Sequence, residues 1–313
     1  MDLAELAKSL NVLESVDSEF RRKARILQSI WREENSYPCG EHQRNKNAKP
    51  RLLGSRLTMP FAEKSLNFIN ENIRKVVQSE VCDPILSKGK LYARPRIFND
   101  LLSSQPICFN LFAELKLNLH LISKVVKELT AGRFCEVTAI NFEHSPGRND
   151  PKYLDDQSAF DVFLECTTSS GGRGFIGIEV KYHENLRNPA GRHRKRYDDV
   201  ASQMKCFAPD SQENLKKSPL QQIWRDHLLT GITRDVDEYD DAIFVILYPK
   251  DNLHVSHAIA EYKMCLLNEK SFADWTLEDF CDNLRKHSQA EWINQFNNRY
   301  LAFNKISDRL KQN

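Results

Sequence analysis

The sequence has no hydrophobic run long enough to cross a membrane. Its longest apolar stretches, such as residues 242–248, are far shorter than the roughly 20 residues that a membrane-spanning helix needs. The first residues include acids and lack the extended apolar block of a secretory signal. We therefore expect a cytoplasmic protein without a membrane partner.

Cysteines are few and scattered. Eight of them are spread singly over 313 residues, with no C-x-x-C pair. This pattern excludes a disulfide framework and disfavours a structural zinc site. Cys39 and His42 come closest to a metal-binding pair, but no second pair follows at zinc-finger spacing. We expect reduced thiols that are mostly packed in the interior.

A strong net charge is also missing. Forty-five basic residues nearly balance 43 acidic ones, which leaves a formal charge of +2. The total charge therefore gives no argument for a nucleic-acid or membrane partner, and any such argument must come from local clusters. With 41% hydrophobic residues, the chain can bury one large core or two modest ones.

The first 98 residues predict a helical N-terminal region. Apolar residues recur at helical intervals in three segments, and a polar connector with prolines and glycines separates the first two from the third. The three segments are residues 4–13, 20–34 and 60–81, and the connector is residues 35–55. We expect the main domain to cover residues 99–313.

In this main domain the patterns alternate between helix and strand. An amphipathic helix is expected at 109–129, a helix from Ser218 to Gly231, and another at 254–267. Strands are expected at 133–144, 158–167, from 174 onward and at 240–249, with a glycine-rich hairpin joining the second to the third. The order predicts an α/β fold in which a mixed β-sheet is flanked by helices on both faces.

Two of these strands carry charges among apolar residues. Glu179 and Lys181 share one face of the third strand, because strand side chains alternate. Asp161 stands inside the second strand and meets Glu179 if the two strands pair. Two converging carboxylates repel each other, and a hard divalent cation such as magnesium or manganese relieves that repulsion. With Lys181 positioning or activating water, these residues predict metal-assisted hydrolysis of a phosphodiester.

This arrangement resembles the PD-(D/E)xK nuclease superfamily, whose fold many restriction endonucleases share. The resemblance rests on Asp161, a spacer of 17 residues and then Glu179-Val180-Lys181, within the order of elements given above. It covers roughly residues 110–249 and implies a restriction-endonuclease-like core. Phe160 stands where the motif has proline, a departure that many members share.

The resemblance also implies roles for individual residues. Asp161 and Glu179 would bind the metal, with the Val180 carbonyl as a third ligand, and Lys181 would be the catalytic lysine. Many members contribute a further acid from the helix before the first strand, and Glu114 matches it. Glu136 on the first strand competes for this role, although we prefer Glu114.

Further residues are candidates for contact with the nucleic acid. Gln221 and Gln222 resemble the polar position that many members carry after the third strand, near the scissile phosphate. A basic cluster follows the third strand and suits contacts with the phosphate backbone. It contains Arg187, Arg192, His193, Arg194, Lys195 and Arg196.

Together these features predict a magnesium-dependent nuclease that hydrolyses DNA, with manganese as a substitute. The resemblance suggests a restriction or defence endonuclease, and cutting both strands of a duplex would favour a homodimer. The alternative is a catalytically silent module that retains the fold and binds nucleic acid or assembles with other proteins. A third interpretation is an unrelated protein in which Glu179 and Lys181 form a salt bridge by chance.

Overall fold

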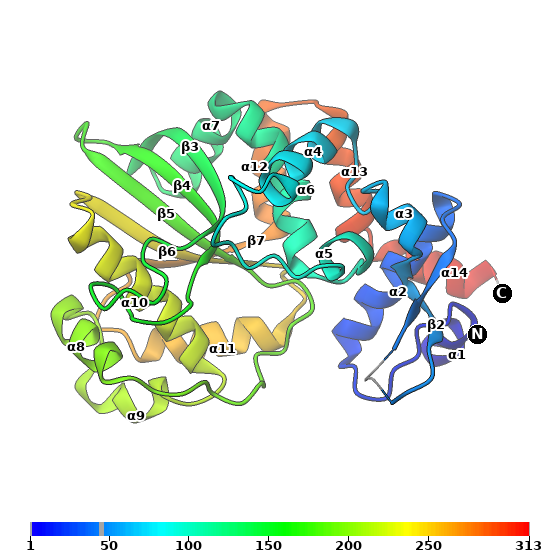
Figure 1. Cartoon of the computed structure of the whole chain (residues 1–313), viewed down its shortest axis with the longest axis horizontal. Helices are drawn as coiled ribbons and strands as arrows, with labels where there is room; N and C mark the ends of the chain where they lie inside the picture. Colours follow the sequence, from blue (N-terminus) through cyan, green and yellow to red (C-terminus); the bar gives the residue numbers. More distant parts are fainter. Residues whose placement is uncertain (1, 44–46, 313) are drawn as a thin grey trace. The chain divides into compact units, whose positions relative to one another are not determined.

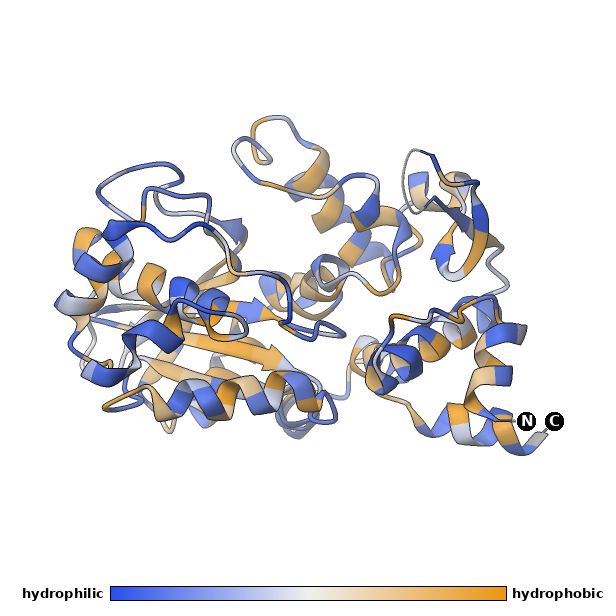
Figure 2. Ribbon diagram, turned by 90° about the horizontal axis from the view of Figure 1, so that it is seen from below, coloured by the Kyte–Doolittle hydropathy of each residue, from blue (hydrophilic) through white to orange (hydrophobic). Residues whose placement is uncertain are grey.

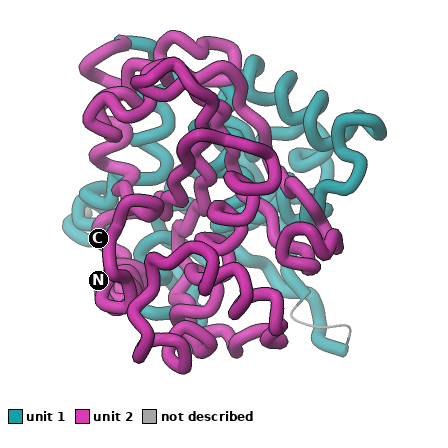
Figure 3. The backbone as a smooth tube through the Cα atoms, turned by 90° about the vertical axis from the view of Figure 1, so that its left-hand side faces the viewer, with its two compact units in different colours: residues 1–114, 289–313 teal, residues 115–288 magenta. Residues whose placement is uncertain are grey.

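The computed structural model describes residues 2–43 and 47–312, and the chain divides into two compact units (Figure 3). Residues 1–114 and 289–313 form the first unit, and residues 115–288 form the second. The C-terminal segment thus returns to the N-terminal unit. The sequence-based division into domains at residue 98 is a separate expectation and stays a prediction.

The first unit is mainly helical and includes one small hairpin, β1–β2, whose strands are antiparallel. The hairpin falls in the segment 35–55 that was expected to be a connector, so that expectation was wrong for this part. The segment 60–81, expected as one helix, contains two α-helices and a π-helical turn. The elements are α1 Leu3–Ser9, α2 Glu19–Glu34, β1 Cys39–His42, β2 Arg51–Leu57, α3 Met59–Glu63, α4 Glu71–Val77, the π-helix Gln78–Cys82, α5 Arg96–Asn99, α6 Ser104–Leu117, α13 Glu291–Tyr300 and α14 Asn304–Gln312.

The second unit is built around a five-stranded sheet with strand order β3-β4-β5-β6-β7 (Figure 1). Strands β3, β4 and β5 pair antiparallel, whereas β5, β6 and β7 pair parallel. This confirms the predicted mixed sheet, to which the structure adds β7. The elements are α7 Leu119–Leu129, β3 Phe134–His144, β4 Phe160–Thr168, β5 Arg173–Val180, α8 Lys195–Met204, the 3-10 helix Pro209–Ser211, α9 Gln212–Leu215, α10 Leu220–Val236, β6 Asp241–Tyr248, α11 Leu253–Met264, β7 Phe272–Thr276 and α12 Leu277–His287.

Helices cover both faces of this sheet, as the sequence predicts. Helices α7 and α12 lie on one face, and α8, α10 and α11 lie on the other (Figure 1). Figure 2 shows the hydrophobic central strands between them. On the α10 face, Phe163, Phe175 and Phe244 pack against Trp224 and Tyr262 in one buried cluster. Because both faces are buried, a charged residue on a central strand is shielded from bulk water.

Two predicted helices have different limits. The helix expected at 109–129 is divided into α6 and α7 at Asn118, whose side chain accepts a hydrogen bond from the N–H of Leu121 and so begins the second helix. Helix α10 continues past Gly231 to Val236. A Cβ at Gly231 would lie 2.3 Å from the sulfur of Met204, so this glycine serves close packing against α8 rather than helix termination.

Helix α10 carries a fully buried histidine, His227. One ring nitrogen lies 2.8 Å from the hydroxyl of Tyr262, and the other lies 2.8 Å from the hydroxyl of Ser271. Burial lowers its pKa from an ordinary 6.5 to about 3. The imidazole is therefore neutral in the folded protein at neutral and mildly acidic pH.

We predict that this histidine makes the fold sensitive to mild acid. Below pH 6.5 the unfolded chain binds a proton that the folded chain does not, so stability falls by about 1.4 kcal/mol per pH unit down to the folded-state pKa. Urea unfolding at pH 7 and pH 5 measures this loss. His227→Gln should remove it, whereas the same change at the exposed His257 should leave it intact. An equal pH dependence in native protein and His227→Gln would contradict the prediction.

Candidate active site

The pairing of β4 with β5 brings the two predicted acids together. Val162 lies opposite Ile178, and the same register continued by one residue places Asp161 beside Glu179. The backbone N–H of Val180 donates to Oδ2 of Asp161 at 2.9 Å. The aspartate thus accepts a backbone hydrogen bond at the end of the β-ladder, which fixes its position next to the glutamate.

A close contact between Phe160 and Gly177 helps to set this register. A Cβ at Gly177 would lie 2.4 Å from the ring of Phe160, so only glycine leaves room for the ring. Phe160 is 1% exposed and packs beside Phe163 and Phe175. The residue that replaces the motif's proline therefore anchors the strand that carries Asp161.

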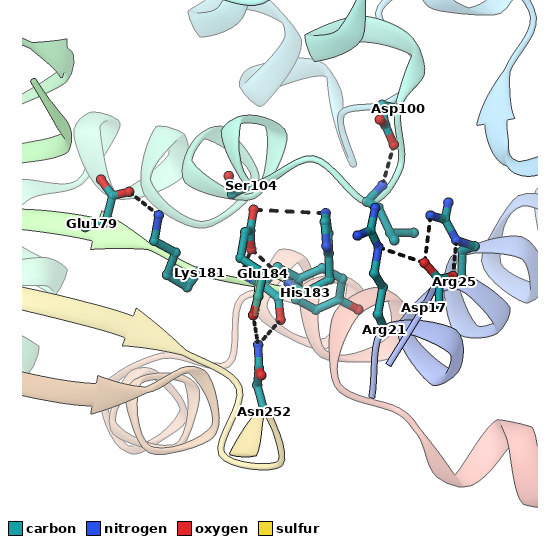
Figure 4. Close-up of polar contacts among 12 residues, drawn as sticks. Asp17, Arg21, Arg25, Asp100, Ser104, Glu179, Lys181, His183, Glu184 and Asn252 are labelled. Carbon is teal, nitrogen blue, oxygen red and sulfur yellow. Dashed lines mark hydrogen bonds and ion pairs between the residues drawn. The ribbon is translucent and has the colours of Figure 1, made fainter. Parts of the chain in front are cut away.

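Lys181 follows the end of β5 and is paired with Glu179 (Figure 4). Its Nζ donates to Oε1 of Glu179 at 2.6 Å, and its backbone N–H donates to the carbonyl of Leu247 on β6. The lysine is only 7% exposed. Burial by itself would lower its pKa, but the negative charges of Glu179 and Glu184 outweigh this effect and raise it above the ordinary value.

The two neighbouring glutamines of α10 have different partners. Nε2 of Gln222 donates to Oε1 of Glu179 at 3.0 Å. The side chain of Gln221 instead bonds both backbone groups of Gly191, accepting from its N–H at 2.6 Å and donating to its carbonyl at 2.7 Å. Gln222 therefore orients a candidate metal ligand, whereas Gln221 fastens the loop after β5 to α10.

Burial, followed by the charge of Glu179, raises the pKa values of two aspartates beside it. The pKa of Asp161 is raised well above its usual range, first by loss of hydration and then by the charge of Glu179. Asp226 lies one helical turn after Gln222 and is 3% exposed. Burial and the charge of Glu179 raise its pKa to about 8. Without a bound cation, Asp161 and Asp226 therefore take up protons at a higher pH than ordinary aspartates do.

A family model described as the PD-(D/E)XK nuclease superfamily matches residues 15–302. The chain belongs to this superfamily. Members generally hydrolyse phosphodiester bonds and typically use divalent metal ions, which implies a nucleic-acid substrate. The membership argues against the interpretation of Glu179 and Lys181 as a chance pair in an unrelated protein. No curated protein and no solved structure matches the chain.

Three acids near the PD-(D/E)XK site were missed by the sequence reasoning. Asp226 had a signal, since it lies four residues after Gln222 on the same face of α10. Glu184 accepts hydrogen bonds from the N–H groups of Tyr182 and His183, and Asn252 donates to the backbone of this turn (Figure 4). The third acid, Glu143 on β3, also raises the pKa of Asp161. Only the pairing of β3 with β4 reveals it.

The two candidates for an auxiliary acid lie in different places. Glu114 belongs to the first unit, where its Oε1 accepts hydrogen bonds from Asn70 at 2.7 Å and Asn72 at 3.3 Å. Glu136 lies opposite Thr167, six residues along β4 from Asp161, which corresponds to about 20 Å of strand. This register separates Glu136 from the paired acids, and the role of Glu114 stays a prediction.

The predicted basic cluster is divided between the loop and the start of α8. Arg194 pairs with Asp155 at 3.0 Å, and Arg196 donates to the carbonyls of Tyr153 and Lys152. Arg192 and Lys195 are exposed, and no hydrogen bond or ion pair is found for their side chains among the described residues. These two and the likewise exposed Arg187 are the cluster members best able to reach a ligand.

The donor set of the paired acids fits a hard divalent cation. Within the described part of the chain, Oδ1 of Asp161 and Oε2 of Glu179 accept no hydrogen bond, although both acids use their other oxygen. Carboxylate oxygens and a backbone carbonyl, such as that of Val180, are the ligands that magnesium and manganese prefer. Residues 2–43 and 47–312 contain no group of three His, Cys, Asp or Glu side chains placed to hold a metal, so water or substrate would complete the coordination.

We predict that Asp161→Asn abolishes cleavage without destabilising the fold. Because the folded-state pKa of Asp161 lies above the unfolded-state value of about 3.9, its ionisation opposes folding, and each unit of that shift corresponds to about 1.4 kcal/mol. Asparagine removes the charge but can still accept the N–H of Val180. The variant should be at least as stable as native protein at pH 8, and the gain should disappear below pH 4. A marked loss of stability in urea unfolding at pH 8 would indicate a structural ion pair instead.

Proposed function

We propose that this protein is a magnesium-dependent nuclease that hydrolyses DNA phosphodiester bonds. The observation that supports the proposal best is the convergence of Asp161 and Glu179, each with one oxygen uncommitted, beside a buried lysine. Such a concentration of negative charge would be costly unless a cation binds there. A module that only binds DNA gains nothing from carboxylates that face a phosphate.

Each residue of the site has a distinct part in this proposal. Asp161 and Glu179, with the Val180 carbonyl, would hold a magnesium ion, which supplies a polarised water and neutralises charge on the phosphate. Lys181 would turn its ammonium group toward the attacking water or a phosphate oxygen. Gln222 holds Glu179 in place through its 3.0 Å hydrogen bond. The fixed orientation lowers the reorganisation needed during the reaction.

The choice of DNA and of an endonuclease rests on the exposed basic residues and on the resemblance to restriction endonucleases. Arg192 on the loop before α8 and Lys195 at the start of α8 are exposed and suit the phosphate backbone of either nucleic acid. We propose a restriction or defence endonuclease located in the cytoplasm, acting as a homodimer so that two sites can cut the two strands of a duplex. Among residues 2–43 and 47–312, none of the helices has the length and hydrophobicity to span a bilayer.

We expect the native protein to nick supercoiled plasmid in the presence of magnesium or manganese and to be inactive in EDTA. Lys181→Ala should lower the rate by at least 100-fold, because one positioned charged group contributes roughly that much to a transition state. Agarose-gel assays with plasmid, together with labelled single-stranded DNA and RNA, measure the rate and the preferred substrate.

Lys124→Ala is the matched control for this experiment. Lys124 is an exposed lysine of α7, on the opposite face of the sheet from α10, and its replacement should leave the rate unchanged. Equal nicking by native protein and Lys181→Ala would point to a contaminating nuclease. Binding of nucleic acid without cleavage under any metal condition would favour the silent module.

A further inference from the structure

A second cluster of charged residues surrounds a pocket of about 260 Å³ in the second unit. Three arginines line it, Arg192 and Arg194 from the loop before α8 and Arg225 from α10, together with Ser158 and Tyr197. Asp156 is the one carboxylate among the lining side chains of this pocket. The lining therefore carries an excess of positive charge.

Arg225 has hydrogen-bond donors to spare. Its Nε is buried without a hydrogen-bond partner, and it lies 4.0 Å from Oδ2 of Asp156 and 3.8 Å from Oδ1 of Asp226, beyond hydrogen-bonding distance. Neither carboxylate therefore accepts a hydrogen bond from this nitrogen. A buried donor without an acceptor is costly, and an anion in the pocket would satisfy it.

Asp156 is committed to organising the pocket wall. Oδ1 accepts the N–H of Ser158 at 2.8 Å, while Oδ2 accepts the hydroxyls of Ser158 at 2.9 Å and Tyr197 at 2.7 Å. These hydrogen bonds fix the position of Asp156, and its single negative charge offsets only one of the three arginines. Arg194 is paired with Asp155, which leaves Arg192 and Arg225 as the guanidinium groups available for a ligand.

The pocket is joined to the candidate active site through one turn of α10. Gln222 bonds Glu179, and its neighbour Gln221 bonds both backbone groups of Gly191, the residue directly before Arg192. One turn later, Asp226 is close enough to Glu179 for the glutamate's charge to raise its pKa, and the preceding residue, Arg225, lines the pocket. The same stretch of helix therefore fixes both the acids and the arginines.

We propose that this pocket binds a phosphate group of the substrate strand next to the phosphodiester that is hydrolysed. Two guanidinium forks with free donors match the tetrahedral oxygens of phosphate. The proposal rests on the proposed function, because the acids define which bond is cut. The phosphate is either an internal phosphodiester or a terminal phosphate monoester, which share this chemistry.

Strand binding in EDTA tests the pocket independently of cleavage. The probe is one fluorescently labelled single-stranded DNA, prepared with a 5′-phosphate or a 5′-hydroxyl, and anisotropy gives its affinity at several salt concentrations. Arg192→Ala should weaken binding about tenfold, as expected for loss of a charge-assisted hydrogen bond. It should also make the plot of log affinity against log salt less steep by about 0.7.

Two further variants complete the experiment. Lys124→Ala removes a positive charge from the opposite face of the sheet and should change neither affinity nor salt dependence. Arg225→Lys keeps the charge between Asp156 and Asp226 but removes the fork, and should weaken binding about fivefold while the thermal unfolding temperature is retained. Equal affinities for native protein, Arg192→Ala and Lys124→Ala would overturn the proposal, as would failure of the native protein to bind either strand.

The pattern of losses identifies the ligand. A loss confined to the 5′-phosphorylated strand indicates a terminal phosphate, and an equal loss with both strands indicates an internal one. If native protein cleaves with magnesium but Arg192→Ala binds normally, the pocket proposal is wrong and the nuclease proposal stands. If binding depends on Arg192 and no substrate is cleaved, the pocket proposal stands and the nuclease proposal is wrong.

Discussion

The repulsion between the carboxylates of Asp161 and Glu179 is the constraint on which the rest of the site depends. The fold holds the two acids together at the end of the β4–β5 hairpin and withdraws water from them, which raises the pKa of Asp161. The partners of Glu179 compensate only part of this cost, because Lys181 and Gln222 both use the same oxygen. A site that keeps this repulsion favours a bound cation.

Helix α10 is the element that connects this constraint to the surroundings. Its apolar residues, Trp224 among them, pack in the core cluster together with residues of the sheet, and this packing fixes the position of the helix. Polar residues of the same helix are thereby held at fixed positions beside the strands. Gln222 reaches the acids, Gln221 fastens the loop after β5, and Arg225 enters the arginine-lined pocket. A small movement of α10 would therefore alter the acids and the pocket together.

The sequence predicted the mixed sheet because β3 to β6 carry strong local patterns, and the spacing from Asp161 to Lys181 identified the paired acids. It did not predict β7, whose five residues contain both Asp274 and Ala273 and show no clear alternation. The sequence also could not show that Gln221 and Gln222 have different roles, because their hydrogen-bond partners, Gly191 and Glu179, lie 30 and 43 positions away in the chain. Glu143 was missed because its importance follows from strand pairing, which is a long-range property, whereas Asp226 had a local signal in its helical spacing from Gln222.

Calorimetric titration with manganese and magnesium tests whether Asp161 and Glu179 form a site for a divalent cation. Native protein should bind manganese, and Glu179→Gln should lose that binding while remaining folded, although loss of the charge that pairs with the buried Lys181 lowers its unfolding temperature. Glu261→Gln, which changes an exposed acid of α11, should bind like native protein. Equal binding by native protein and Glu179→Gln would contradict the claim and place any metal elsewhere.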